Sequence, residues 1–258
     1  MRRRVRNIVS VLTLAALVAV FLLINAGKAK KRALITCEGV NVEFTDSYRF
    51  VTEDDVKGYL DNYYGAYIGQ RIDSIKLHKV ESILNVQSAI LNSEAYTTDD
   101  GMLNIIISQR EPVVRFQNGD HGFYADECGF IFPLQDNYTS NVPVIDGNIP
   151  LNVEEGFKGA PGSDKEKAWM AGVLELLNFM DKSRAWSENI VQMHVDEKGD
   201  LVLIPREGNE RFIFGSPDGA EAKFGRIEKY YRYILPEKGE GYYRTVNVKF
   251  DKQIVCKK

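Results

Sequence analysis

Apolar positions follow three patterns along the chain: one continuous run, a stretch of mixed helical and alternating spacing, and a series of short alternating segments. The continuous run, Ile8–Ile24, carries no charge and contains only one serine and one threonine. As a helix rising about 1.5 Å per residue it covers roughly 26 Å, close to the ~30 Å hydrocarbon core of a bilayer. We therefore expect one transmembrane helix over residues 8–26, between a tail (residues 1–7) and a linker (residues 27–34).

The alternative for this run is a cleaved secretory signal, whose apolar part is usually about 7–15 residues long. Ile8–Ile24 is longer, and the segment after it offers only a poor small-residue cleavage site, with Lys28 inside Gly27–Ala29. A retained anchor is therefore favoured. Because no second long apolar run follows, the chain is expected to cross a membrane once at most.

Residues 35–110 combine both spacings in the order strand, helix, helix, strand, strand. Thr52 is followed by three acidic residues, and its hydroxyl together with Asp55 is the pattern of a helix N-terminus. A turn at Asp99–Gly101 separates the last two strands. The pattern predicts a compact α+β module in which two helices back a small sheet. Its expected elements are strands over residues 33–44, 86–96 and 103–108, and helices that begin near Thr52 and Asp73.

After Pro112 the pattern changes to short strands separated by turn residues, which predicts a sheet-dominated domain over residues 111–258. Two helices are expected within it. Ser163 or Asp164 can cap the first helix, and Pro217–Gly219 opens the second. The expected strands cover residues 113–116, 122–125, 130–134, 190–195, 201–204, 210–214, 243–250 and 253–256.

Charge is divided unevenly, although the formal net charge is only −3. Residues 1–32 contain eight basic residues and no acidic residue, so the remainder carries a net charge of −11. Nucleic acid is not expected as a partner, because phosphate binding needs a basic face. Basic residues flank the apolar run equally on both sides, so charge alone does not decide its orientation.

The three cysteines, Cys37, Cys128 and Cys256, are too few and too scattered for a disulfide framework. No C-x-x-C pair supports a zinc site or a thioredoxin-type site. Small buried thiols are favoured, and one disulfide with one free thiol remains an alternative outside the cytoplasm.

Sequence signatures of catalysis are missing. The chain has no G-x-G-x-x-G loop, no P-loop, no G-x-S-x-G elbow and no H-E-x-x-H helix. His78 and Glu81 lie three positions apart on an expected helix and could form half of a metal site. A solvated pair is favoured, because metal sites need about four ligands. We therefore expect no catalytic residue, no metal and no cofactor.

Five short motifs follow one another behind the apolar run. They are FVTEDDV at residues 50–56, a strand followed by Q-R-x-P within residues 105–115, a hairpin with a D-x-x-G turn at residues 123–133, P-x-I-x-G at residues 143–147, and closing strands within residues 245–255. In this order they resemble the FtsQ/DivIB family of bacterial cell-division proteins. The resemblance covers nearly the whole chain and implies a POTRA-type module over residues 35–110 and a β domain over residues 111–258.

Membership of this family implies a non-enzymatic scaffold of the division machinery. The N-terminus would be cytoplasmic, the anchor would cross the inner (plasma) membrane, and the main body would lie outside the cytoplasm at the division septum. The implied partners are the FtsB and FtsL proteins, with an indirect link to the septal peptidoglycan synthase.

The family resemblance also implies how the partner binds: FtsB adds a strand beside the last strand of the β domain. Such pairing takes its affinity from backbone hydrogen bonds at an open sheet edge. Lys249 and Phe250 fall where the family has a basic–aromatic pair, so the ring could be an apolar anchor and the amine could meet an acidic residue. The alternative is that the apolar members of the segment are ordinary core residues. The expected partner-binding residues are Thr245, Val246, Asn247, Val248, Lys249 and Phe250.

Two other classes of protein remain open. One is a POTRA-bearing component of outer-membrane assembly or secretion, which would usually show several POTRA repeats or a barrel pattern. The other is an anchored envelope enzyme, which would need a nucleophile–base pair or metal ligands. The sequence contains neither set of features, so the scaffold is favoured.

Overall fold

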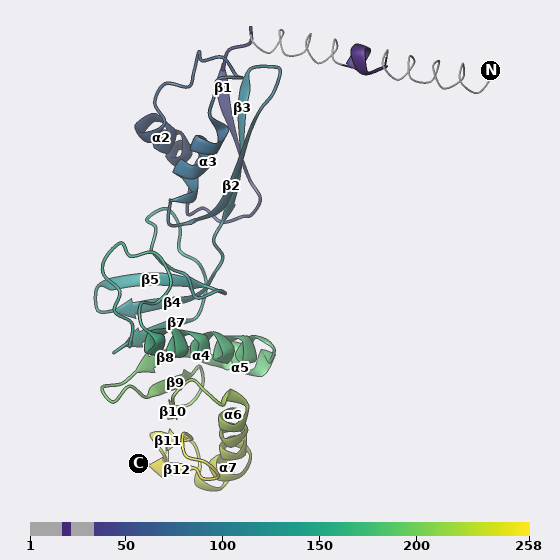
Figure 1. Ribbon diagram of the computed structural model, residues 1–258. Coiled ribbons are helices and arrows are strands. Elements are labelled where there is room, and N and C mark those ends of the chain that lie inside the picture. Colours follow the sequence, from purple (N-terminus) through teal and green to yellow (C-terminus); the bar gives the residue numbers. More distant parts are fainter. Residues whose placement is uncertain (1–16, 22–33) are drawn as a thin grey trace, which may run out of the picture. The chain divides into compact units, whose positions relative to one another are not determined.

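The structure, a computed structural model, describes residues 17–21 and 34–258 and divides into two compact units (Figure 1). A small β-α-α-β-β module is followed by a sheet-dominated domain with helices, which confirms the expected α+β class at this level. The first unit comprises the described residues up to Ser47 and Val51–Gln109, and the second comprises Tyr48–Phe50 and Arg110–Lys258.

Only a short piece of the expected membrane anchor falls within the described chain. Residues 17–21 are helical, whereas the tail, the rest of the expected helix at 8–26 and nearly all of the linker lie outside the described residues. Across residues 17–21 and 34–258, no helix combines the length and the apolar content needed to span a bilayer.

The first unit is a three-stranded sheet with two helices. Its strand order is β1-β3-β2, with β1 parallel to β3 and β2 antiparallel to it. The elements are β1 (Gly39–Phe44), α2 (Glu53–Tyr63), α3 (Leu77–Asn85), β2 (Ile90–Thr97) and β3 (Met102–Gln109).

Helix α2 begins where its capping residues predict. The Thr52 hydroxyl accepts a hydrogen bond from the Asp55 backbone N–H, and the Asp55 carboxylate accepts one from the Thr52 N–H. This capping box satisfies two backbone donors that the first turn would otherwise leave unpaired. Val56 and Leu60 then lie on one helical face and are fully buried.

Helix α3 begins at Leu77, so the expected start near Asp73 is wrong. Residues 72–74 form a turn, in which the Asp73 carboxylate pairs with Arg71 and the Ser74 hydroxyl donates to the Arg71 carbonyl at 2.7 Å. Polar side chains that bond locally in this way stabilise turns in competition with helix. On α3 itself, the Glu81 carboxylate accepts from the Ala95 N–H at 3.0 Å, so it is held by the neighbouring strand.

The second unit is built on a nine-stranded mixed sheet. Its order is β12-β11-β10-β9-β8-β7-β4-β5-β6. Strand β7 is not predicted by the sequence pattern, and it pairs in parallel with β4 on one side and β8 on the other. The strands are β4 (Pro112–Asn118), β5 (His121–Asp126), β6 (Ile131–Pro133), β7 (Val144–Gly147), β8 (Ile190–Val195), β9 (Leu201–Pro205), β10 (Arg211–Gly215), β11 (Thr245–Asn247) and β12 (Val255–Lys257).

The helices of the second unit differ partly from the two that the sequence predicts. Ser163 caps α4 (Asp164–Asp181) through a capping box with Glu166, as expected. A short helix that the pattern does not predict, α5 (Arg184–Asn189), follows it. The second expected helix is divided into α6 (Ala220–Lys229), a π-helical turn η1 (Tyr230–Ile234) and α7 (Leu235–Lys238).

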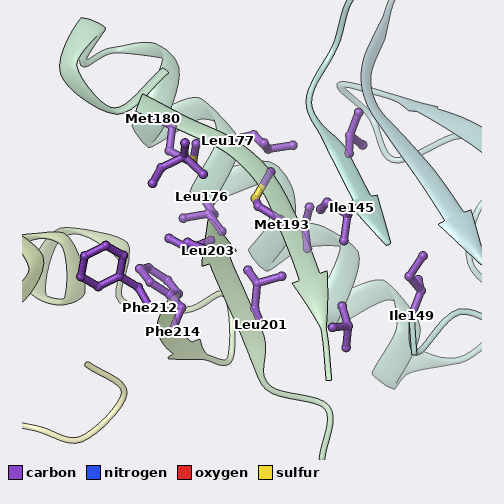
Figure 2. Close-up of a cluster of buried hydrophobic side chains, with 14 of the residues drawn as sticks. Ile145, Ile149, Leu176, Leu177, Met180, Met193, Leu201, Leu203, Phe212 and Phe214 are labelled. Carbon is purple, nitrogen blue, oxygen red and sulfur yellow. The ribbon is translucent and has the colours of Figure 1, made fainter. Parts of the chain in front are cut away.

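One hydrophobic core lies between the sheet and these helices. Figure 2 shows side chains of α4 meeting those of the middle strands, such as Leu176 and Met193. The same cluster includes Phe224 and Ile227 of α6, so both long helices bury residues against the sheet. The other labelled members in Figure 2 are Ile145, Ile149, Leu177, Met180, Leu201, Leu203, Phe212 and Phe214.

Two of the family-like motifs meet in one buried contact of the second unit. Arg110, from the Q-R-x-P motif, donates from Nη1 to Asp126 Oδ2 at 2.8 Å, and its guanidinium lies 3.6 Å from the centre of the Phe130 ring. Asp126 begins the D-x-x-G turn, and its Oδ1 accepts from the N–H groups of Cys128 and Phe130. The residues of these two motifs therefore hold the start of the second unit against the turn at residues 126–130.

All three cysteines lie in the described chain, and each is free. Cys37 is buried and Cys256 is partly buried, and burial raises the pKa of both thiols. Cys128 is exposed, so the expectation of buried thiols is wrong for this residue.

Candidate partner-binding site

The expected binding segment, residues 245–250, begins as a strand inside the sheet. Thr245–Asn247 form β11, which pairs in parallel with β10 and antiparallel with β12. Both backbone edges of β11 are therefore occupied, and a partner strand cannot be added directly beside it. The sheet edge next to this segment belongs to β12 (Val255–Lys257), one of the two end strands, which has no strand on its outer side in the described chain.

Three apolar residues of the segment do not share one surface. Val246 and Val248 are fully buried in the core, which agrees with the alternative that they are ordinary core residues. Phe250 is 43% exposed, because the chain leaves the strand after Asn247 and turns at Asp251–Lys252. Phe250 is thus the apolar side chain of this segment that a partner can reach.

Lys249 is bound within the chain. Its Nζ lies 2.5 Å from Asp200 Oδ2 and 5.5 Å from the centre of the Phe250 ring. Its backbone N–H donates to Asn247 Oδ1 at 3.1 Å. The family resemblance implies that the amine meets an acidic residue of a partner, whereas in this structure its acidic neighbour is Asp200. Lys249 therefore positions the segment and lies beside the exposed ring.

Helix α6 holds the same segment from the core side. Arg226 donates from Nε to the Val248 carbonyl at 2.8 Å, and its guanidinium lies 3.7 Å from the Asp251 carboxylate. Lys223, also on α6, donates from Nζ to the Ser216 carbonyl at 2.6 Å, and burial lowers the pKa of this amine. Sequence patterns do not identify Arg226 or Asp200, because they lie far from residue 250 in sequence and belong to no motif.

The reversal between β11 and β12 places the last strand at the end of the sheet. Lys252 has a positive φ of 56°, which is uncommon for a non-glycine residue and typical of a tight turn. After it, Val255 is 37% exposed on β12. The sequence predicts a strand over 253–256, and the family resemblance implies pairing beside the last strand, although the expected contact residues all lie in the preceding segment, 245–250. Local sequence gives no signal for which strand ends a sheet.

The arrangement is suited to binding by strand addition. An end strand offers unpaired backbone donors and acceptors, and the exposed side chains of Phe250 and Val255 can add apolar contact. Elsewhere in the described residues, no group of three or more His, Cys, Asp or Glu side chains is placed to hold a metal ion.

Taken together, the fold and this edge define a modular protein with a POTRA-type module and a C-terminal sheet domain. Comparison with known families agrees for both parts: residues 35–108 match the POTRA-like domain, and residues 111–257 match the family described as FtsQ/DivIB, C-terminal related. The second match covers more than half of the chain, so the chain belongs to the FtsQ/DivIB C-terminal-related family. This relationship connects the protein with bacterial cell division and with a non-enzymatic family. No curated protein matches the chain.

Proposed function

We propose that this protein is a membrane-anchored scaffold of the bacterial division machinery that binds the FtsB–FtsL pair. In this proposal residues 8–26 cross the inner membrane once, residues 1–7 are cytoplasmic, and the body lies outside the cytoplasm at the division septum. The scaffold joins FtsB–FtsL to the septal peptidoglycan synthase and performs no chemistry itself. Support comes from family membership and from the form of the C-terminal sheet edge.

The observation that carries the proposal is the open end strand β12 with an exposed aromatic residue nearby. Backbone hydrogen bonds to β12 would supply affinity for an added FtsB strand, and alternate side chains would supply specificity. Phe250 has the size and exposure of an apolar anchor, whose removal typically costs about 1–2 kcal/mol or more of binding free energy.

The test measures binding of FtsB–FtsL from the same organism to the full-length protein in detergent micelles. Phe250→Ala is expected to weaken binding by roughly 5–30-fold. Tyr96→Ala is the matched control, because Tyr96 is 44% exposed on β2 in the first unit. If the folded Phe250→Ala protein binds as tightly as the wild type, the side-chain assignment is wrong.

A second pair of variants tests the backbone edge. Val255→Lys places a charge on the end strand, which is how natural proteins discourage strand addition. Val191→Lys is its control, since Val191 is 44% exposed on β8 in the middle of the sheet. We expect the first variant to lose binding and the second to retain it. Failure of the wild-type protein to bind FtsB–FtsL at all, or recovery of outer-membrane assembly factors in its place, would overturn the function itself.

A further inference from the structure

A hollow of about 670 Å³ lies in the second unit beside the last turns of α4. Its apolar wall comes from Leu174, Leu177 and Met180 of α4 and from Val113 and Ile190 of the sheet. Leu177 and Met180 also belong to the hydrophobic core (Figure 2), so this wall is continuous with the core and rigidly backed. The volume falls within the roughly 300–1,000 Å³ of typical ligand pockets and is large enough for several side chains.

Four carboxylates surround this apolar wall. Glu111 precedes β4, Glu127 lies in the turn between β5 and β6, and Glu175 and Asp181 are on α4. All four are exposed, and within the described chain none of them forms an ion pair. No lysine, arginine or histidine lines the hollow. The hollow therefore has an apolar wall, its charged lining residues are all acidic, and Asn178 and Ser187 add uncharged polar groups.

This chemistry selects the class of ligand. An anion or an acidic peptide would be repelled by the four carboxylates. The carboxylates are not clustered as metal ligands, since no such group occurs in the described residues. Lysine and arginine side chains combine an apolar stem with a charged head, so they can lie on the apolar wall while reaching the carboxylates.

We propose that this hollow docks a cationic, amphipathic segment of a partner protein, which inserts apolar side chains against α4 and pairs its lysines or arginines with Glu111, Glu127, Glu175 and Asp181. The charge complementarity and the apolar wall together define the occupant. The site goes beyond the proposed function, because the hollow lies at β4 and β8 and three strands, β9, β10 and β11, separate β8 from β12 in the sheet. Binding here therefore does not require the β12 edge.

The experiment uses a fluorescein-labelled helical peptide of about 18 residues, roughly five turns, with leucines on one face and lysines on the other. Its binding to the full-length protein in detergent is measured by fluorescence anisotropy. We expect saturable binding that weakens as salt is raised, because the paired charges are exposed and screened. A peptide with the same composition in scrambled order, which lacks the apolar face, is expected to bind much more weakly.

The decisive variant neutralises all four carboxylates: E111Q/E127Q/E175Q/D181N. Each exposed pair contributes a few-fold at most, so removing four is expected to weaken binding roughly tenfold. The control, E154Q/E155Q/E197Q/E207Q, changes the net charge equally by replacing exposed acids of the same unit that do not line the hollow. Leu174→Ala tests the apolar wall and should weaken binding several-fold.

Three results would overturn the proposal. An equal loss of peptide affinity in the two quadruple variants would mean that the peptide responds only to the overall negative charge of the domain and does not bind in the hollow. Equal affinity for the scrambled and amphipathic peptides would mean that the hollow does not recognise an amphipathic segment. Displacement of the peptide by spermidine, together with unchanged peptide affinity of Leu174→Ala, would mean that the hollow selects small cations. None of these measurements involves FtsB–FtsL, so their failure is distinguishable from failure of the proposed function.

Discussion

Gly147 ends β7 where the backbone of β8 approaches too closely for any side chain. A Cβ atom placed at this position would lie 2.3 Å from the Val195 carbonyl oxygen and 2.6 Å from His194 Cε1. Its φ of +91° is also in the region that favours glycine. The last residue of the P-x-I-x-G motif is therefore required by the parallel pairing of β7 with β8.

Replacing Gly147 with alanine should destabilise the second unit by several kcal/mol. The positive φ alone costs about 1–2 kcal/mol for a residue with a Cβ, and the clash with backbone adds about 1–3 kcal/mol. Gly199→Ala is the matched control, because Gly199 has a φ of +79° but nothing lies within 4 Å of the Cβ that alanine would add there. Chemical denaturation followed by the fluorescence of Trp169 and Trp186 measures both. Equal destabilisation by the two substitutions would contradict the close-approach argument.

At the same scale, the expectations for residues 245–250 agree with the structure only in part. Alternation places Phe250 on one face with Val246 and Val248, whereas in the structure only Phe250 of these three is exposed. Position in the chain and the basic–aromatic pattern do not show that Lys249 pairs with Asp200, because an ion pair between residues far apart in sequence depends on the folded sheet. Nor can alternation alone separate the buried Val246 and Val248 from a binding face, since both arrangements have the same period.

The π-helical turn η1 is the element that departs most from regular geometry. Such turns are rare, and they interrupt the regular hydrogen bonding of the helix. Here the turn directs Tyr230 into the core, where its ring lies 5.7 Å from that of Phe212. Burial raises the pKa of Tyr230 to about 12.

This pKa predicts that stability falls at alkaline pH. Below about pH 10 the tyrosine is protonated in both states, and between about pH 10 and 12 it ionises in the unfolded chain but not in the folded one. The free energy of unfolding therefore decreases over this window, by up to about 2–3 kcal/mol from this residue.

Tyr230→Phe should remove that part of the decrease, as measured by denaturation monitored by circular dichroism near pH 9 and pH 11.5. Tyr233→Phe is the matched control, because it removes a tyrosine hydroxyl from a 61% exposed position of the same turn. A pH dependence that is the same in both variants would refute the burial argument.

Elements with local signals can be predicted, and elements that depend on distant pairing cannot. The starts of α2 and α4 follow from the capping residues Thr52 and Ser163, which act within one turn. Strand β7 has only four residues, and its parallel partners β4 and β8 are not joined to it by a hairpin. No local turn signal could reveal it. The position of β12 at the sheet end likewise follows from strand order, which a single sequence does not encode locally.

For the whole molecule, the near-neutral total charge conceals two oppositely charged parts. The basic residues 1–32 flank the apolar run, and the body carries the net charge of −11. Part of that excess surrounds the hollow beside α4, whereas the amine of Lys249 near the β12 edge is neutralised by Asp200. The two proposed binding surfaces therefore differ in kind: one relies on backbone pairing and the other on charge.

The proposed membrane topology can be tested with the protein's own cysteines. Cys128 is exposed, whereas burial raises the pKa of the Cys37 and Cys256 thiols and so keeps them protonated and less reactive. If the body lies outside the cytoplasm, a membrane-impermeant maleimide should label the full-length protein in cells whose outer membrane alone has been permeabilised. Cys128→Ser should abolish most of this labelling.

Labelling that appears only after the inner membrane is broken would place the body in the cytoplasm, where it could not reach the synthase that acts on septal peptidoglycan. Mass spectrometry of the labelled protein would also distinguish a retained anchor from a cleaved signal, since cleavage would remove the basic N-terminus together with residues 8–26.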